Sequence, residues 1–162
     1  MIKKISFLFY KILFYLDLFF KLITKRSILV HFKDFFQNDS YKDILIFNNK
    51  INFFAPNELI EWRISTFFTK EPETLEWIDS FEKEGLIFWD IGANIGLYSI
   101  YNSLKNKNST TFAFEPSTSN LRILTRNISI NNLEKKIKVF PIPLTNVKNR
   151  FLLMNEGDFL EG

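Results

Sequence analysis

The chain has 162 residues, of which 46% are apolar and 24% charged, and this composition predicts an ordered globular fold rather than disorder. The net charge is only +3, and no stripe of Arg and Lys among aromatic residues crosses the central region, so nucleic acid is excluded as the expected partner. Cysteine is absent and His31 is the only histidine, which excludes disulfides, thiolate metal sites and cysteine nucleophiles and leaves too little material for a metal centre.

Residues 1–25 predict an amphipathic helix. The stretch Ile5–Ile23 is apolar but interrupted by charges, which argues against a membrane span, and no small-residue cleavage site follows, which argues against a signal peptide. The charges fall within one arc at helical spacing, opposite an apolar face: Lys11, Asp17, Lys21 and Lys25 against Leu8, Ile12, Tyr15, Phe19 and Ile23. Two interpretations stay open. The helix packs on its own domain or a partner subunit, or it attaches a cytoplasmic protein to the inner face of a membrane, helped by Lys3 and Lys4.

Residues 26–84 predict a helical and hairpin extension. Asparagine tolerates positive φ and suits a tight turn between two short apolar runs. Proline in the first turn of a helix, followed by acidic residues at the positive end of its dipole, is a typical helix start. The expected elements are hairpin strands at Ile44–Phe47 and Ile51–Phe54 around a turn at Asn48–Lys50, a helix over Glu58–Phe68, and a helix beginning at Pro72 with Leu75, Ile78 and Phe81 buried.

Residues 85–162 predict an α/β domain. The first apolar run, Leu86–Trp89, is typical of a parallel strand covered on both faces. The elements that follow are a helix over Ile95–Leu104, a strand at Thr110–Phe114, a helix capped by Ser117 or Ser119 with Leu121, Leu124 and Ile128 inside, and a strand at Ile137–Phe140. Strand, helix, strand, helix, strand at this spacing predicts a parallel sheet with right-handed crossovers.

A glycine-containing loop, Asp90–Gly96, connects the first buried strand to its helix. A side chain at Gly92 would obstruct a ligand that approaches the backbone, and Gly96 is expected to let the helix pack closely on the sheet. Asn94 stands where many such loops carry glycine, and asparagine is the next most tolerant residue of positive φ. The loop therefore predicts a ligand site at the carboxyl end of the first strand.

Two carboxylates sharpen this prediction. Asp90 ends the first strand and Glu115 ends the second, at the sheet edge where open α/β proteins bind ligands. A carboxylate at the position of Glu115 can accept hydrogen bonds from both hydroxyls of a ribose, and Pro116 fixes the backbone as the chain leaves the strand. The alternatives are a helix cap or turn-stabilising acid for Asp90, and a solvated strand end for Glu115.

The acid at Asp90 favours S-adenosylmethionine over a dinucleotide as the ribose-bearing cofactor. A pyrophosphate bound at the start of the helix would be repelled by a carboxylate nearby, whereas a sulfonium and an α-ammonium group would be attracted. The spacing Gly92, Asn94, Gly96 also departs from the G-x-G-x-x-G pattern of dinucleotide sites. An NAD-binding dehydrogenase fragment stays as a disfavoured alternative.

Four segments together resemble the FkbM family of class I methyltransferases over roughly residues 60 to 145. They are the D-I-G-A-N-I-G run at Asp90–Gly96, the E-P pair at Glu115-Pro116, the N-I-S-I-N-N-L run at Asn127–Leu133, and the upstream Phe67–Ile78. The resemblance implies a Rossmann-like fold and transfer of a methyl group from S-adenosylmethionine to a hydroxyl of a sugar, glycan or natural product. It implies a cofactor-binding set of Asp90, Gly92, Ala93, Asn94, Gly96, Glu115 and Pro116. No catalytic base is identified.

Several other polar and aromatic residues receive structural interpretations. Asn127 and Asn131 are expected at a helix end and turn rather than at a ligand. Core packing is favoured over a role in an adenine or substrate pocket for Trp77, Trp89 and Tyr98. A surface or hydrogen-bonded position is favoured for His31 over a role as general base.

The sheet is expected to be incomplete. A class I methyltransferase has about seven strands, whereas only one more strand, at Phe151–Met154, is expected after the third. The other edge of the first strand would then be bare. Three explanations stay open: the later half is missing from the sequence, a second chain supplies it, or the protein is a non-catalytic remnant that binds a membrane or a partner.

Overall fold

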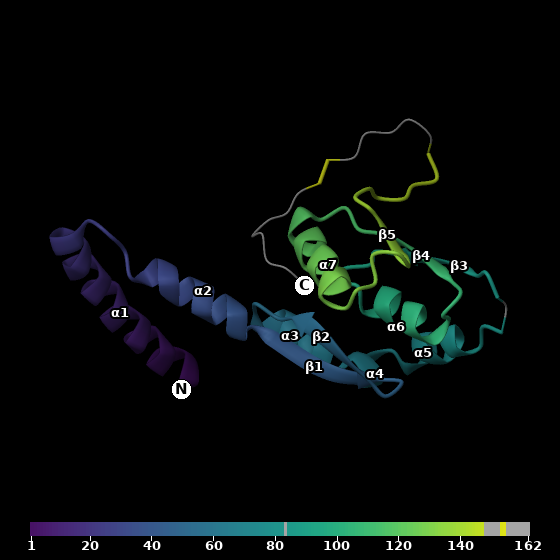
Figure 1. The fold of residues 1–162 in the computed structure, drawn as a ribbon, viewed down its shortest axis with the longest axis horizontal. Helices are drawn as coiled ribbons and strands as arrows, with labels where there is room; N and C mark the ends of the chain where they lie inside the picture. The colour runs from purple at the N-terminus through teal and green to yellow at the C-terminus, as the bar shows by residue number, and fades with distance from the viewer. Residues whose placement is uncertain (83, 148–152, 155–162) are drawn as a thin grey trace. The chain divides into compact units, whose positions relative to one another are not determined.

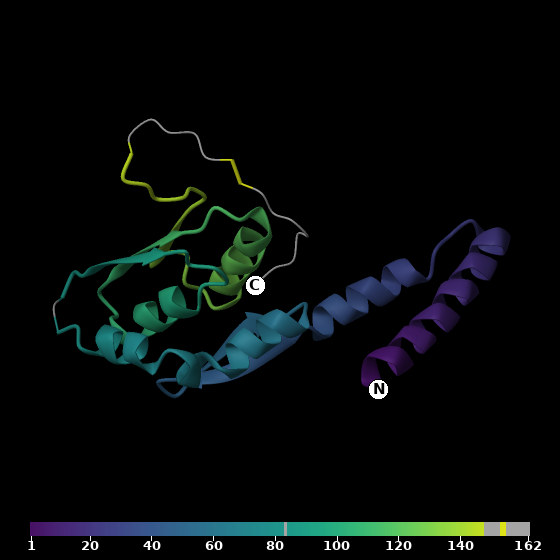
Figure 2. The ribbon, with the colours of Figure 1, turned by 180° about the vertical axis from the view of Figure 1, so that it is seen from behind.

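The computed structural model describes residues 1–82, 84–147 and 153–154. The chain divides into two compact units, Met1–Ser40 and Tyr41–Gly162, and each is described by itself (Figures 1 and 2). The domain boundaries expected from the sequence, after residues 25 and 84, stay a prediction. The hairpin beginning at Tyr41 packs on a helix of the α/β region.

The first unit consists of two helices, α1 (Ile2–Thr24) and α2 (Leu29–Asp39). The predicted N-terminal helix is therefore present. Among the residues that the structure describes, no helix is long and apolar enough to cross a membrane. His31 lies exposed on α2, as interpreted from the sequence.

One buried aspartate connects the two helices of this unit. Asp17 is 1% exposed, and its Oδ1 accepts hydrogen bonds from the backbone amides of Ile28 (2.7 Å) and Leu29 (3.1 Å) and from the Ser27 hydroxyl (2.8 Å). Its Oδ2 lies 2.8 Å from the ammonium of Lys21. Burial opposes ionisation, but Lys21 and the hydrogen bonds outweigh it and hold the pKa of Asp17 well below its usual range. Asp17 thus caps the start of α2 from α1.

The second unit begins with an antiparallel hairpin of β1 (Tyr41–Ile46) and β2 (Asn49–Phe54). Its turn lies at Phe47 and Asn48, one residue earlier than predicted, and both have positive φ (48° and 64°). Two-residue turns of this kind match the twist of the strands. The Asn49 side chain closes the turn by donating to the Phe47 carbonyl (3.0 Å), and the Phe47 ring packs on Tyr101 (4.8 Å between centroids).

Three short helices follow the hairpin: α3 (Glu58–Ser65), α4 (Phe67–Lys70) and α5 (Pro72–Asp79). Asn57 caps α3 by accepting from the backbone amide of Ile60 (2.9 Å). The single helix predicted over Glu58–Phe68 is divided at Thr66. The helix start at Pro72 is confirmed.

Three parallel strands, β3 (Ile87–Ile91), β4 (Thr110–Phe114) and β5 (Ile137–Phe140), form a sheet in the order β3-β4-β5. The helices α6 (Leu97–Lys105) and α7 (Thr118–Ile130) connect them, and Ser117 caps α7 by accepting from the Asn120 amide. This βαβαβ arrangement, with helices and a hairpin before it, confirms the predicted Rossmann-like α/β fold. The strand predicted at Phe151–Met154 falls partly on residues outside those described, and Leu153 and Met154 are not in a strand.

Helices cover one face of the described sheet. Both crossovers run in the same direction across the sheet, so α6 and α7 lie on the same face (Figure 1). Ile87, Trp89 and Ile91 point to the other face and are each more than half exposed. The expected cover on both faces of the first strand is therefore wrong for the described residues, and so is the expected core packing of Trp89 and of Trp77, which is 56% exposed.

The edge position of β3 agrees with the sequence prediction. Among the described residues, β3 pairs with β4 alone, and its other edge has no strand beside it. This edge and the uncovered face leave apolar surface on the first strand.

Two asparagines, Asn127 of α7 and Asn131 directly after it, connect the hairpin to the α/β region. Asn127 is fully buried, and its side chain accepts from the Phe54 amide (2.8 Å) and donates to the Ile95 carbonyl (2.9 Å). The Asn131 side chain exchanges two hydrogen bonds with the backbone of Asn52. Both asparagines thus have structural contacts.

One hydrophobic core runs through this unit. Its most buried members include Phe53, Phe54, Ile60, Ile64, Ile78, Ile95, Ile100, Ile123 and Leu124.

Candidate functional site

The loop between β3 and α6 has the backbone conformation that its residues allow. Gly92, Asn94 and Gly96 all have left-handed φ values, of 75°, 50° and 89°. Asn94 therefore adopts the positive φ predicted for it. The backbone amides of Gly92 and Ala93 donate to the Phe114 carbonyl (2.9 and 3.0 Å), so the loop is anchored to the end of β4.

The glycines of the loop differ in their surroundings. A Cβ at Gly92 would meet nothing within 4 Å, so the backbone is open there, as expected where a ligand approaches. A Cβ at Gly96 would lie 2.6 Å from Leu124 Cδ1. The close approach at Gly96 is thus to α7, whereas the sequence analysis expected it to be to the sheet.

The two predicted carboxylates lie on the same face of the sheet. Asp90 of β3 is in register with Ala113 of β4, and Glu115 follows two residues later, so its side chain points the same way. Both are buried, with exposed fractions of 7% and 5%. Their charges are close enough for Glu115 to raise the pKa of Asp90.

Asp90 contacts the first turn of α6. Its Oδ2 accepts from the Ser99 hydroxyl at 2.5 Å. Burial raises the pKa of Asp90 most, hydrogen bonds from Ser99 lower it, and the charge of Glu115 raises it further, with a net shift upward. Asp90 therefore has the helix-capping contact considered in the sequence analysis, and its ionised form is held at an energetic cost.

Glu115 orders the loop directly. Its Oε2 accepts from the Asn94 amide and its Oε1 from the Ser117 amide, both at 2.8 Å. A carboxylate has about four lone-pair sites, so two amide donors leave capacity for hydroxyl donors. Pro116, the last residue of the predicted set, stands between Glu115 and the cap of α7 and is partly buried. Glu115 is thus a buried, hydrogen-bonded acid and not a solvated strand end.

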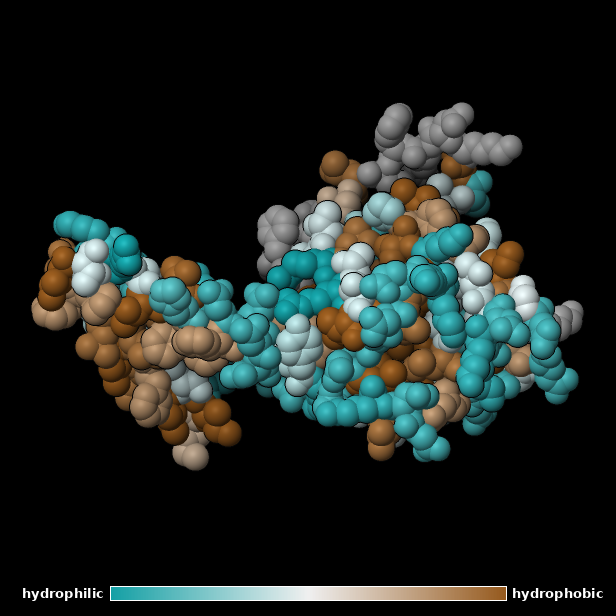
Figure 3. Space-filling view, in the orientation of Figure 1, coloured by the Kyte–Doolittle hydropathy of each residue, from teal (hydrophilic) through white to brown (hydrophobic). Residues whose placement is uncertain are grey.

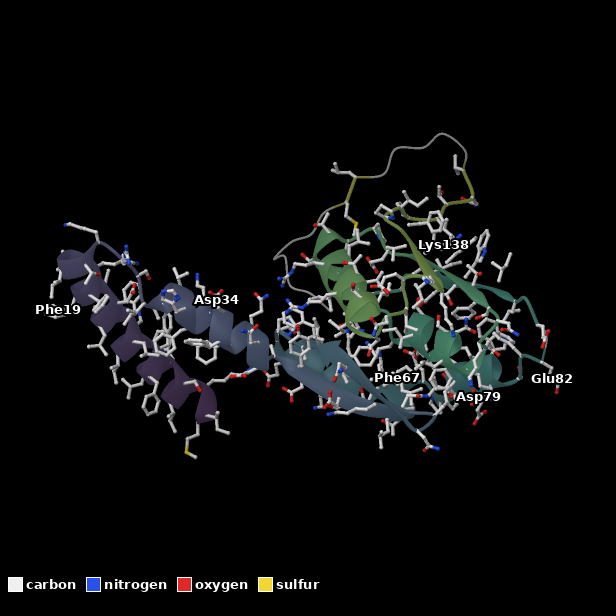
Figure 4. All side chains as sticks on the ribbon, in the orientation of Figure 1. Phe19, Asp34, Phe67, Asp79, Glu82 and Lys138 are labelled. Atoms are coloured by element: carbon white, nitrogen blue, oxygen red, sulfur yellow. The ribbon has the colours of Figure 1, made fainter. Side chains whose placement is uncertain are left out.

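A cavity of about 210 Å³ lies against this loop. Its wall combines loop backbone, two basic residues, one acid and apolar side chains: Arg63, Phe67, Lys70, Glu71, Gly92, Ala93, Asn94, Ile95, Leu97 and Tyr98. The Phe67 ring, labelled in Figure 4, packs 5.6 Å from the Tyr98 ring between centroids. One side of the cavity is therefore apolar and aromatic, and the other side carries charged groups.

The charged side of the cavity is partly paired. The Tyr98 hydroxyl donates to Glu71 Oε2 at 2.8 Å, and the Lys70 ammonium lies 3.4 Å from Glu71 Oε1. The hydrogen bond from Tyr98 lowers the pKa of Glu71, with help from Lys70 and Arg63 and against burial. Burial, and then Glu71, raise the pKa of Tyr98. At neutral pH this pair is an ionised carboxylate and a neutral phenol.

Two buried polar atoms on the cavity wall, Arg63 Nε and Asn94 Oδ1, have no hydrogen-bond partner among the described residues. A buried group of this kind costs stability unless a ligand or water satisfies it. One is a donor on a cation and the other a neutral acceptor. The cavity thus presents unsatisfied groups of both kinds beside the loop.

Arg63, Lys70 and Glu71 were not predicted as site residues from the sequence. They come from α3, α4 and the residue before α5, and no local motif connects them to the loop. Lys70 and Glu71 do fall in the upstream segment that resembles FkbM proteins, which is the one signal that could have identified them. Tyr98 lines the cavity, although core packing was favoured for it.

The chain matches no protein-family model, and no curated protein matches it either. The resemblance to the FkbM family therefore stays a prediction. Among solved structures, the chain is similar to precorrin-6Y C5,15-methyltransferase from Geobacter metallireducens, with 24% identity over 44% of this chain and a TM-score of 0.40. It is also similar to the C-terminal domain of that enzyme from Rhodobacter capsulatus, with 22% identity over 46% of this chain and a TM-score of 0.40. A third similar structure is TYW2 from Pyrococcus horikoshii in complex with MeSAdo, with 16% identity over 65% of this chain and a TM-score of 0.46. The chain spans 37 to 40% of the length of these structures.

Proposed function

We propose that residues 41–162 bind S-adenosylmethionine at the β3–α6 loop and form the cofactor-binding part of a methyltransferase. The observation that carries this proposal is the convergence of two buried carboxylates, Asp90 and Glu115, on one left-handed loop. An acid at Asp90 disfavours a pyrophosphate beside the loop and favours a cationic ligand. Glu115 retains the capacity to accept hydroxyls of a ribose.

The cavity supports a second part of the proposal, which concerns the amino-acid end of the cofactor. That end carries an α-carboxylate and an α-ammonium, and the cavity offers Arg63 and Lys70 for the first and Glu71 with the Asn94 side-chain oxygen for the second. A zwitterionic ligand would satisfy both unpartnered atoms. We infer that the open backbone at Gly92 leaves room between this cavity and Glu115.

When bound, S-adenosylmethionine supplies an electrophilic methyl group on a sulfonium. The residues of this chain would bind and orient it: Glu115 at the ribose, the open backbone at Gly92 beside the amino-acid part, and Asp90 as a nearby negative charge. Orientation of the acceptor for in-line displacement contributes much of the rate of such reactions. The resemblance of the motifs supports a hydroxyl of a sugar, glycan or natural product as the acceptor. We propose no general base.

Calorimetry with S-adenosylhomocysteine tests the proposal. We expect Glu115→Gln to weaken binding on the order of ten- to a hundredfold, because charge-assisted hydrogen bonds are lost. Glu134→Gln is the matched control, since Glu134 is an exposed acid of the same unit whose side chain accepts from the Ser129 hydroxyl. A folded sample that binds NADH but not S-adenosylhomocysteine would overturn the proposal.

A truncated ligand tests the amino-acid subsite by itself. 5′-Methylthioadenosine has the adenosine and sulfur but no amino acid. We expect Arg63→Gln to weaken binding of S-adenosylhomocysteine and to leave binding of 5′-methylthioadenosine unchanged. An equal loss for both ligands would show that Arg63 acts through the fold and would remove the subsite from the proposal, while the nucleoside site would stand.

A further inference from the structure

The helix α1 carries a continuous apolar face that α2 leaves uncovered. Its members recur at helical spacing over the whole helix and are between 48% and 66% exposed: Ile5, Leu8, Ile12, Tyr15, Leu16, Phe19 and Ile23. Figure 3 shows apolar residues along the length of this helix, and Figure 4 shows Phe19 pointing away from α2. A contiguous exposed face of seven large apolar side chains marks an interaction site.

The second helix covers a different side of α1. A groove between the two helices is lined from α1 by Tyr10, Leu13 and Phe14 and from α2 by Phe32 and Phe36. The hydrogen bonds of Asp17 fix the start of α2 on this side. The uncovered face is therefore a stable feature of the two-helix unit rather than a surface that α2 could fold over.

The charge of this unit favours an anionic partner for the apolar face of α1. Residues 1–40 contain seven basic and three acidic residues, for a net charge of +4, whereas the remaining 14 basic and 15 acidic residues give −1. On α1, Lys4 and Lys11 lie along one edge of the apolar face, whereas Lys21 pairs with Asp17 on the side toward α2. An apolar face flanked by lysines suits an anionic lipid surface. Two copies of the chain, face to face, would instead bring two +4 units together.

We propose that residues 1–40 bind the surface of an anionic lipid bilayer with α1 lying in its plane. The apolar face enters the boundary between headgroups and acyl chains, and the lysines contact lipid phosphates and carboxylates. The proposal rests on the first unit alone and is independent of the cofactor site.

The absence of cysteine allows a direct test with the full chain. Phe19→Cys, labelled with an environment-sensitive fluorophore, reports on the apolar face, and Leu45→Cys, on an exposed position of β1, is the matched control. We expect the label at position 19 to shift to the blue and brighten with vesicles of phosphatidylcholine and phosphatidylserine, and the label at position 45 to stay unchanged. No response at position 19, or the same response at both positions, would overturn the proposal.

Variants separate the charged and apolar contributions. Replacing Lys3, Lys4 and Lys11 with Gln should lower the partition coefficient on anionic vesicles roughly a hundredfold, as expected for three basic residues near such a surface. Phe19→Glu should abolish binding, and Leu45→Glu should not. All three tryptophans lie in residues 41–162, so their emission checks that the second unit stays folded. Equal binding to pure phosphatidylcholine, or a dimer that Phe19→Glu dissociates without any vesicle binding, would refute the lipid assignment.

Discussion

Each unit of the molecule buries an aspartate, and the two have opposite energetics. Asp17 has three donors from the start of α2 and the ammonium of Lys21, so its ionised form is favoured. Asp90 has Ser99 as its donor and a second acid, Glu115, close by, so its ionised form is disfavoured. A fully partnered acid stabilises the fold, whereas an acid held at a cost is typical of a functional site. The contrast supports a structural role for the first and a ligand role for the second.

The helices of the two units also differ, in how much of each helix is buried. The α/β helix α6 buries Ile100, Tyr101 and three small polar residues, while α1 buries Asp17 alone. Both helices are amphipathic in sequence. An apolar stripe in the sequence therefore predicts an amphipathic helix. Only the structure shows whether another element packs against its apolar face. Variants that damage one unit and spare the other test this division.

Gly96→Ala is expected to have the largest effect, confined to residues 41–162. The new Cβ would meet Leu124 at 2.6 Å in a backbone conformation that only glycine adopts without strain. Strain and overpacking together should lower the free energy of unfolding by about 2–5 kcal/mol. Urea unfolding followed by tryptophan emission measures it. In a double-mutant cycle with Leu124→Ala, the cost of Gly96→Ala should fall by the overpacking part alone. No remaining cost in the Leu124→Ala background would show that the conformation of residue 96 carries no strain.

Asn127→Ala comes next and tests how the hairpin is held to the α/β region. It leaves the Phe54 amide and the Ile95 carbonyl without their buried partner. We expect a loss of about 2–3 kcal/mol in the free energy of unfolding. Asn131→Ala, at a partly buried position, should cost less, and hydrogen exchange at Phe54 should rise in the first variant only. Equal exchange in both variants would contradict this assignment.

These asparagines also mark the limit of what the sequence could predict. Local patterns were sufficient for β4 and β5, which have the expected bounds, and for the positive φ of Asn94, because strand runs and turn preferences are local. The partners of Asn127 lie 73 and 32 residues away along the chain, and the cavity residue Arg63 has no sequence motif. The exposed state of Trp89 was missed because an apolar run does not show which face its neighbours cover.

Asp17→Asn should affect the first unit alone. The pKa of Asp17 is lowered by folding, so its contribution to stability is present above the unfolded value near 3.8 and is lost as the pH falls below it toward the folded pKa. We expect faster hydrogen exchange at the amides of Ile28 and Leu29 at neutral pH, with no change in tryptophan emission. Lowering the pH should have the same effect in the unsubstituted protein. Unchanged exchange at both amides would show that α2 does not depend on this cap.

Asp90→Asn should have the smallest effect on stability, and in the opposite direction. Folding raises the pKa of Asp90, so the folded state holds its proton more tightly and stability declines as the pH rises from the ordinary value near 3.8 through the folded pKa. Asparagine can still accept from the Ser99 hydroxyl but carries no charge beside Glu115. The Tm at neutral pH should therefore rise by a few degrees, while the affinity for S-adenosylmethionine falls because a cation loses its nearby carboxylate. In the unsubstituted protein the same affinity should increase with pH as Asp90 ionises. A lower Tm with unchanged affinity would assign Asp90 to the structure of α6 alone, and the contrast with Asp17 would then disappear.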